Sequence, residues 1–597
     1  MVKHTLSLVA SATLVASLGA NTLNLDPIVV SASKTEQSLK NVTANIDIIT
    51  AEEIEERHYT TIAEALNTLS GVSITSNGGV GQLDSIFIRG IDSKRILVVI
   101  DGIRYNEPAG LSGAPLAQLS VDDIERIEVI KGAQSGIWGA DASGGVINII
   151  TKRPEKGFFA RGGFEYGSFD TQKYSSTLSY KTDQGYVKLN ANRFETDGFS
   201  AFEAKKSSPN YGKRGDELGL EKDGSINNTY NIQAGIYLSG KDELNFSYKK
   251  IDARYDYDSS SSDNLTNVSS LHHYFKAVNY VHTSDGYKTK LYAQQSKFDR
   301  TQNTFNAKSL VNEFGLQTHV NYTDNGDLVI GLDKQNFEHI NNGLKYQTEG
   351  VFIANTNVFG NWVFTESIRY DNNTQFDEKL TGKVGTKYRF SDDFSLSSNF
   401  GTAYNAPTLS NLSYTPTLKP ESTQSFDATV AYKEVKLTYF QNTITDMINY
   451  SFTPTFHYFN EEGESKLKGY EVSYQKTLFE NTHINVNYTH LSAKNSTNQD
   501  LERRPKEQLG FGVDYYGFEN LHLNLNGSYV GSRYDSVNQT GAQTGKYTLW
   551  NSVINYTINK TFKTYIKVDN LFDKYYQTVD GYATSPRAYY AGMEVSF

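Results

Sequence analysis

From residue 158 to the C-terminus, apolar and polar residues alternate along many short stretches. Leu244, Phe246 and Tyr248 alternate with Asn, Ser and Lys, and the last stretch alternates in the same way up to Phe597. A period of two places successive side chains on opposite faces of a β-strand. One apolar face and one face of Asn, Ser, Thr and Lys are expected of strands with lipid outside and water inside. This pattern favours a transmembrane β-barrel over a soluble sandwich.

The part of the chain before the alternating region has a different pattern. Residues 71–152 contain the short apolar runs SIFIRG, RILVVIDG, IERIEVIKG and GGVINIITK, each ended by Gly or by a charged residue. Such runs are typical of short buried strands. Upstream, Thr50 precedes Glu53 by three residues and Thr61 precedes Glu64 likewise, which predicts two short helices with capping boxes, the second ended by Gly71. We therefore expect a small α+β unit ahead of the barrel.

The first 32 residues carry two further signals. Residues 1–20 have an early Lys, an apolar middle and small residues at the end, as expected of a secretory signal peptide. The run LDPIVVSA at 25–32 is extended and apolar, with one Pro. It is either an edge strand of the folded unit or a segment offered to a partner by strand addition. The residues alone leave both open.

Composition removes several classes of protein. The chain of 597 residues has no Cys, so it has neither disulfides nor thiolate metal sites. Its net charge of -10 disfavours nucleic acid as a partner. Beyond the N-terminus no apolar run reaches 18 residues, which excludes a helical membrane span. The motifs G-x-S-x-G and H-E-x-x-H and a phosphate-binding glycine loop are all missing, so we do not expect an enzyme.

Several motifs, taken in order, resemble the TonB-dependent outer-membrane transporters. They are LDPIVVSA, FIRG, DGIR, IERIEVIKG, GGVINIITK and Asn-Leu-Phe-Asp at 570–573 with a terminal Phe597, and they extend over nearly the whole mature chain. The resemblance implies a monomer in the bacterial outer membrane, with a plug domain at 33–153 inside a 22-stranded antiparallel barrel at 154–597. The length is sufficient, because a spanning strand takes roughly 10 residues.

The same resemblance implies that residues 25–32 are the TonB box. The residues expected to contact TonB are Asp26, Pro27, Ile28, Val29, Val30, Ser31 and Ala32. Through this box, TonB would couple import to the proton gradient of the inner membrane. The alternative of another class is an outer-membrane adhesin or passive channel, which would need neither a box nor a plug.

Within the family, the chain is most similar to the cobalamin (vitamin B12) transporters. The similarity lies in NGGVGQLDSIFIRG at 77–90, DGIRYN at 101–106 with AGLSG after it, and LERRPKEQ at 501–508. It implies substrate contacts at Asn77, Leu83, Ser85, Asp92, Leu111, Ser112, Arg503 and Asn538. Asp92 stands where those transporters have Asn, and Asn538 where they have Tyr. A ferric siderophore or haem is the alternative cargo.

Cobalamin transporters also order their loops with calcium, and no other prosthetic group is implied. The corresponding positions here are Glu221, Asp223, Tyr257 and Asp258, with Asp263 as a further candidate. Closely spaced oxygen ligands on loops suit calcium. However, Ser200 and Gly219 replace two ligands, and Lys222 lies between the acids in sequence. The alternative is that these are ordinary solvated loop charges.

Overall fold

The computed structural model describes residues 28–29, 34–110, 112–303 and 305–597, with only the backbone of Ile28 and Val29. The predicted signal peptide therefore lies outside the described residues, as do Leu111 and, of the predicted TonB contacts, Asp26, Pro27, Val30, Ser31 and Ala32. Among the described residues, no helix combines the length and apolarity that a membrane span requires.

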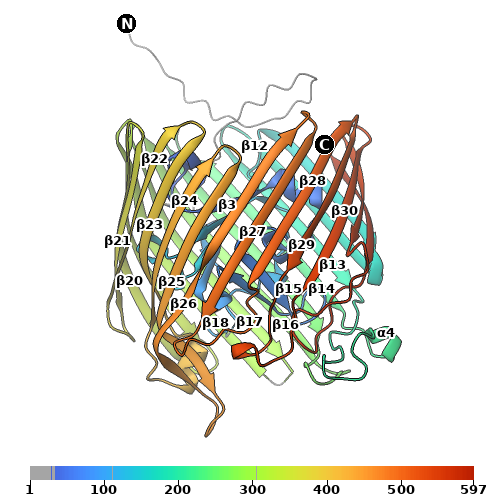
Figure 1. Cartoon of the computed structure of the whole chain (residues 1–597). Coiled ribbons are helices and arrows are strands. Elements are labelled where there is room, and N and C mark those ends of the chain that lie inside the picture. Colours follow the sequence, from blue (N-terminus) through green and yellow to red (C-terminus); the bar gives the residue numbers. More distant parts are fainter. Residues whose placement is uncertain (1–27, 30–33, 111, 304) are drawn as a thin grey trace.

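A closed barrel of 22 antiparallel strands, β11 to β32, dominates the molecule (Figure 1). Strand β11 pairs with β32, which closes the ring. The barrel strands are β11 (Gly157–Gly167), β12 (Thr171–Lys181), β13 (Gly185–Thr196), β14 (Ser225–Tyr237), β15 (Asp242–Asp256), β16 (Val268–Ser284), β17 (Tyr287–Gln302), β18 (Phe305–Thr323), β19 (Gly326–His339), β20 (Leu344–Phe359), β21 (Trp362–Asn373), β22 (Lys379–Ser391), β23 (Phe394–Asn405), β24 (Glu421–Tyr432), β25 (Val435–Ser451), β26 (His457–Leu478), β27 (Thr482–Lys494), β28 (Glu507–Phe518), β29 (Leu521–Val530), β30 (Tyr547–Thr557), β31 (Phe562–Asp569) and β32 (Ala588–Ser596). The predicted strand number and antiparallel order are confirmed.

The alternation of the sequence maps onto the two faces of the barrel wall. Leu244 and Phe246 are exposed on the outer face of β15, as are Tyr589 and Met593 on β32. Inward-facing polar residues such as Asn524 are buried against the interior. A lipid-facing apolar surface around a polar interior is what the period of two predicts.

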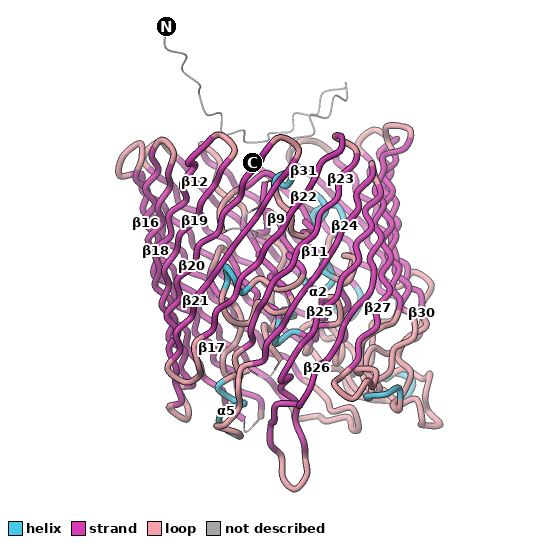
Figure 2. Tube along the Cα trace, turned by 60° about the vertical axis from the view of Figure 1, so that its left-hand side comes forward, coloured by secondary structure: helices cyan, strands magenta, loops and turns pink. Residues whose placement is uncertain are grey.

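The two ends of the barrel differ in their connections. At the short-turn end, the turns between strands have two to four residues, as at 182–184 and 238–241. The long-loop end carries the extended loops, such as 197–224, 406–420 and 531–546. Figure 2 shows the β25–β26 hairpin projecting beyond the other strands at the long-loop end. Two short helices also belong to these loops, α4 (Gly215–Leu218) and α5 (Leu409–Tyr414).

Inside the barrel lies a small α+β domain, the plug. One sheet has the order β3-β9-β10-β7-β8 and the other β4-β5-β6; β10 runs parallel to β7. The plug elements are β3 (Ile46–Thr50), α1 (Ala51–Arg57), α2 (Ile62–Leu66), β4 (Val72–Ser76), β5 (Asp84–Ile88), β6 (Ile91–Asp92), β7 (Ile96–Ile100), β8 (Ile103–Arg104), β9 (Ile124–Lys131), α3 (Ser135–Trp138) and β10 (Gly145–Thr151). Each of the four apolar runs forms a strand where the sequence predicts one. Ahead of them, β1 (Ile28–Val29) pairs with β2 (Gln37–Ser38).

The two predicted helix starts are correct, and one predicted helix end is wrong. The hydroxyl oxygen of Thr50 accepts a hydrogen bond from the Glu53 amide, and that of Thr61 from the Glu64 amide, both at 3.2 Å. However, the second helix ends at Leu66, before Gly71. Gly71 has φ +67°, and a Cβ there would lie 2.0 Å from Glu471 Oε1 on the barrel wall. Glycine is required here because the plug backbone passes so close to the wall.

Candidate functional site

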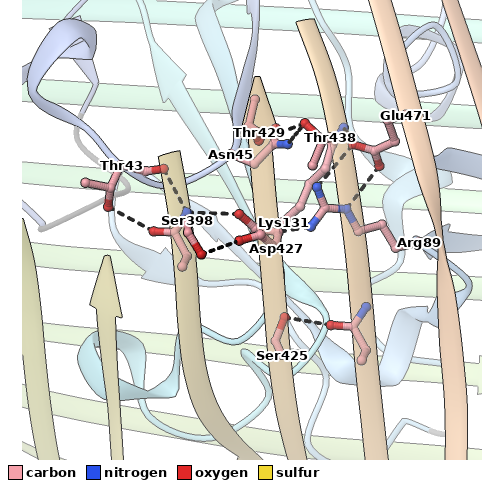
Figure 3. A network of polar contacts seen from close by, with 12 residues as sticks. Thr43, Asn45, Arg89, Lys131, Ser398, Ser425, Asp427, Thr429, Thr438 and Glu471 are labelled. Atoms are coloured by element: carbon pink, nitrogen blue, oxygen red, sulfur yellow. Dashed lines mark hydrogen bonds and ion pairs between the residues drawn. The ribbon is translucent and has the colours of Figure 1, made fainter. Parts of the chain in front are cut away.

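Buried ion pairs fix the plug against the barrel wall (Figure 3). Arg89 donates two hydrogen bonds to Glu471 of β26, at 3.0 and 3.1 Å, and reaches Asp427 of β24 at 3.5 Å. Lys131 lies 3.3 Å from the same Glu471. Breaking such a pair on one side leaves an unpaired buried charge, which costs about 3–5 kcal/mol. The plug therefore has a defined position in the lumen.

A second charged group lies nearer the long-loop end. Arg95 donates to Glu421 of β24 at 2.7 and 2.6 Å and to Asp92 at 2.6 Å. Arg504, from loop 495–506, is 3.5 Å from Asp92. Burial alone would raise the pKa of Asp92, but Arg95, Lys94 and Arg504 together lower it. Asp92 is therefore held as a carboxylate by the protein itself.

The predicted substrate residues of the plug gather at two neighbouring apices. Asn77, Leu83 and Ser85 belong to the β4–β5 hairpin, where the Asn77 amide donates to the Leu83 carbonyl at 3.1 Å, and all three are partly exposed. Asp92 follows on β6, which pairs with β5. Ser112 is adjacent, because a Cβ on the next residue, Gly113, would lie 2.4 Å from the Ser93 carbonyl.

The two predicted substrate residues of the barrel share one pair of loops. Arg503 donates to Asp535 at 2.7 Å, joining loop 495–506 to loop 531–546. The Asn538 amide donates to the Asp500 carbonyl, also at 2.7 Å. The described contacts of Arg503 are thus with the neighbouring loop.

Arg504, which the sequence analysis did not select, makes the contacts with the plug. Its Nε donates to the Gly90 carbonyl at 3.0 Å, and its guanidinium carbon lies 4.6 Å from the centre of the Phe87 ring. The only signal in the sequence was its position beside Arg503 in LERRPKEQ.

Another unselected residue, Asp84, lies in the β4–β5 hairpin beside Leu83 and Ser85. Burial raises the pKa of its carboxyl to about 7. The plug surface at this apex therefore changes charge near neutral pH.

A third unselected element is α5, whose Leu409 amide donates to the Pro108 carbonyl at 2.8 Å on the second plug apex.

Three of the predicted calcium ligands come together in the long loops. Carboxylate oxygens of Glu221, Asp258 and Asp263 all lie within 4.8 Å of one another. Asp223 is adjacent and accepts a hydrogen bond from the Ala201 amide at 2.6 Å. One buried oxygen of Glu221 and one of Asp223 have no hydrogen-bond partner among the described residues. Burial, with the charges of Asp258 and Glu221, raises the pKa of Asp223 to about 8.

Clustered carboxylates with unpartnered buried oxygens fit a hard divalent cation. Lys222 lies between these acids in sequence. Its ammonium forms an ion pair with Asp197, at 3.6 Å. Ser200 is close to the cluster, with its Oγ 3.4 Å from both Asp258 and Asp263. Tyr257 packs edge-on against Tyr255, with ring centres 6.3 Å apart, and its role as a ligand stays a prediction.

Two family models match this chain. Residues 156–571 match the model "TonB dependent receptor-like, beta-barrel", and residues 38–146 match "TonB-dependent Receptor Plug Domain". The chain belongs to the TonB-dependent receptor family. The receptor is accordingly an outer-membrane protein, and its family consists of transporters and receptors. In such barrels, the short turns face the periplasm and the longer loops face the outside.

Solved structures share the fold at low sequence identity. The siderophore receptor PirA from Acinetobacter baumannii is 16% identical, with a TM-score of 0.79 over 92% of this chain and 98% of that one. A mutant of the ferric enterobactin receptor PfeA from Pseudomonas aeruginosa is 17% identical, with a TM-score of 0.81 over 96% and 100%. The FrpB iron transporter from Neisseria meningitidis is 15% identical, with a TM-score of 0.77 over 94% and 100%.

Proposed function

We propose that this receptor imports cobalamin or a related corrinoid across the outer membrane, with TonB as the source of energy. The supporting observation is the plug surface at the extracellular end. There, Asn77, Leu83 and Ser85 on one hairpin adjoin Asp92 and Ser112. These are the positions that correspond to corrin contacts in the cobalamin transporters. A large rigid ligand is held by many such weak contacts, with a few polar groups fixing its orientation.

The coupling to TonB rests on the segment at 26–32. Within it, Ile28 and Val29 are already extended and pair with Gln37 and Ser38 through two residue pairs. An extended segment with so short a pairing is suited to leave β2 and add to a strand of a partner. The outer membrane lacks ATP, so a pull transmitted by TonB supplies the work of release.

Calcium is part of the same proposal. The acids that would hold it are Glu221, Asp258 and Asp263, with Asp223 beside them. When bound, the ion would neutralise these carboxylates and join loop 197–224 to loop 257–267. Ordered loops would then present a preformed surface to the cargo, which reduces the entropy cost of binding.

A ferric siderophore is the second candidate cargo. Two observations favour it: similar structures include siderophore and iron receptors, and aromatic rings cluster at the extracellular end. Tyr414, Tyr450, Phe452, Phe456 and Tyr458 form a chain of ring contacts from α5 to the β25–β26 hairpin, such as Phe456–Tyr458 at 5.2 Å. Flat aromatic iron chelators could stack on such rings.

Binding to the purified receptor in detergent discriminates between the cargoes. We expect cobalamin to bind tightly with calcium and more weakly after chelation, and a ferric catecholate siderophore not to bind. If a ferric siderophore binds and cobalamin does not, the cargo is the ferric siderophore. In cells, deletion of residues 26–32 should abolish uptake while binding persists; uptake that survives the deletion would indicate a passive channel.

A further inference from the structure

The lipid-facing surface of β15, β16 and β17 changes from apolar to polar at one level of the barrel wall. On the periplasmic side of this level, the outward side chains include Phe246, Val278 and Leu291, which are 43%, 46% and 54% exposed. On the extracellular side, the outward side chains are polar from Lys250 onward on β15 and from Gln295 onward on β17. The apolar band of a membrane barrel ends where the lipid headgroups begin. This level of the wall therefore meets the headgroups of the outer leaflet.

Three lysines surround one tyrosine at the headgroup level, and we call Lys250, Tyr274, Lys276 and Lys297 the lysine patch. Tyr274 lies directly opposite Lys250 and Lys297 in the strand register, and Lys276 is two residues further along β16 on the same face. The residues that follow the lysines in sequence are buried on the inner face: Ile251, Ala277 and Phe298. Opposite side chains have Cβ atoms about 4.5–5.5 Å apart, and diagonal neighbours about 7–8 Å. Three long side chains at this spacing can direct their ammonium groups to one ligand.

The two outward acids nearest the patch are already neutralised by cations. Asp252 lies 2.5 Å from Lys250 and 2.8 Å from His272, and Asp299 lies 2.9 Å from Lys308. The other two lysines of the patch have no ion-pair partner in the part of the chain that the structure describes. Lysines near a membrane surface are attracted by anionic lipids. The patch therefore offers two positive charges to the headgroup layer.

The surroundings of the patch suit a ligand that has acyl chains as well as a charged head. The Lys250 ammonium lies 5.7 Å from the ring centre of Tyr274, and such aromatic rings are typical of the membrane interface. Toward the periplasm, Phe246 lies opposite Val278, and Phe314 lies opposite Ala293. These apolar side chains form a continuous surface directly below the cations. An acyl chain on this surface would keep its headgroup beside the lysines.

We propose that the lysine patch binds a phosphate group of an outer-leaflet glycolipid, whose acyl chains lie on the apolar surface below it. A phosphate monoester carries about two negative charges at neutral pH, which complements the two lysines without a counter-charge. Ammonium–phosphate contacts are charge-assisted hydrogen bonds, which are stronger than neutral ones. The bound lipid would fix the level of β15 to β17 in the membrane. Because the patch faces lipid and not the lumen, the inference does not depend on which cargo the receptor imports.

Native mass spectrometry of the purified receptor in detergent tests this site, with lipid A that carries two phosphates as the probe. Lys276→Gln combined with Lys297→Gln removes both unpaired charges, whereas Lys276→Arg combined with Lys297→Arg keeps them. Lys334→Gln is the matched control. Lys334 also faces lipid and is 46% exposed, but its ammonium lies 3.0 Å from Glu349. A loss that is specific to the patch should therefore spare this variant.

The double Gln variant should weaken the tightest binding of lipid A at least about tenfold, because each lysine near an anionic lipid contributes about 1 kcal/mol. The double Arg variant and Lys334→Gln should keep the affinity of the parent receptor. Unchanged affinity in the double Gln variant would overturn the inference. An equal loss in Lys334→Gln would also overturn it, because the effect would then come from the overall charge of the surface.

Two further probes separate the headgroup from its alternatives. Dephosphorylated lipid A should bind the parent receptor as weakly as lipid A binds the double Gln variant. Inorganic phosphate should not displace bound lipid A, because it lacks the acyl chains that contact the apolar surface. If dephosphorylated lipid A binds as tightly as lipid A, the acyl chains alone are recognised. If inorganic phosphate displaces lipid A, the patch is a simple anion site. Either result refutes the proposed glycolipid site and leaves the proposed import function untouched.

Discussion

Arg504 Nη2 of the barrel loop and Asp92 Oδ2 of the plug lie 3.5 Å apart, across the boundary between the two domains. Asp92 also accepts from Arg95 at 2.6 Å. The Asp92 carboxylate, at the position where the resemblance to cobalamin transporters implies Asn, is thus neutralised within the receptor. A charge at this position is therefore compatible with the proposed cargo, because the cargo does not have to neutralise it.

Arg504→Gln should destabilise the receptor more than Arg503→Gln. Arg504 is buried, 8% exposed, and contacts Asp92, Gly90 and Phe87, so its loss should cost about 1–3 kcal/mol. Arg503 is 34% exposed, and loss of its pair with Asp535 should cost under about 1 kcal/mol. Calorimetric unfolding in detergent compares the two. Equal losses would mean that Arg504 does not anchor the loop to the plug.

Gly71→Ala should disrupt the central ion pair of Figure 3. The new Cβ would displace Glu471 from Arg89, at a cost of about 3–5 kcal/mol. Gly212→Ala is the matched control, because Gly212 also has a positive φ, +95°, but no atom lies within 4 Å of its Cβ position. It should cost only about 1 kcal/mol of backbone strain. Similar unfolding midpoints for the two variants would refute the steric argument.

Asp258→Asn should abolish high-affinity calcium binding, measured by isothermal titration calorimetry. Asp258 contributes a carboxylate to the cluster, and its oxygens already accept from the Phe202 and Asn264 amides at 2.8 and 2.7 Å, which fixes their position. Asp216→Asn, at an exposed acid in loop 197–224, the loop that holds Glu221, is the control and should bind calcium normally. An equal loss of calcium binding in both variants would mean that only the overall charge of the loops matters.

Calcium binding should strengthen as pH rises from 6 to about 8.5. The pKa of Asp223 is raised to about 8 by burial and by Asp258 and Glu221, so without the ion this carboxyl is mostly protonated at neutral pH. A cation binds the ionised form and displaces the proton. Titrations in buffers of different ionisation enthalpy should therefore detect proton release, and Asp223→Asn should remove it. Affinity independent of pH would exclude Asp223 from the site.

The parent receptor should lose stability as the pH rises above about 4, and Asp84→Asn should not show this loss. The pKa of Asp84 is raised to about 7 from an ordinary value near 3.8, so the folded state holds the proton more tightly than the unfolded state. Stability therefore falls as pH rises from about 4 to about 7 and is constant beyond that. The raised pKa of Asp84 sets an upper limit of about 4 kcal/mol on this loss of unfolding free energy. Because the side chain is partly exposed, we expect a loss of about half that value or less.

Unfolding midpoints at pH 5 and pH 8 measure this difference. The parent receptor should lose more between the two pH values than Asp84→Asn does. Ser85→Ala, at the next residue of β5, is a control that leaves the carboxyl in place and should keep the parent pH dependence. If parent and Asp84→Asn respond alike, the Asp84 carboxyl is solvated and does not titrate near neutrality.

The sequence by itself determined the barrel wall, the plug strands and the helix starts. These are local properties: the side-chain period of Leu244 and Phe246 follows from strand geometry, and the caps at Thr50 and Thr61 bond only three residues away. The order of the motifs along the chain was also sufficient to identify the family.

Only the tertiary structure decided which charges meet. Arg504 reaches Asp92 although more than 400 residues separate them, and the acids at 221, 258 and 263 converge from two loops. Neighbouring side chains in a loop have no fixed period, so sequence could not distinguish Arg504 from Arg503. A cavity lined by Lys34 lies between the plug and the barrel wall, and it depends on how the surfaces of these two domains fit together.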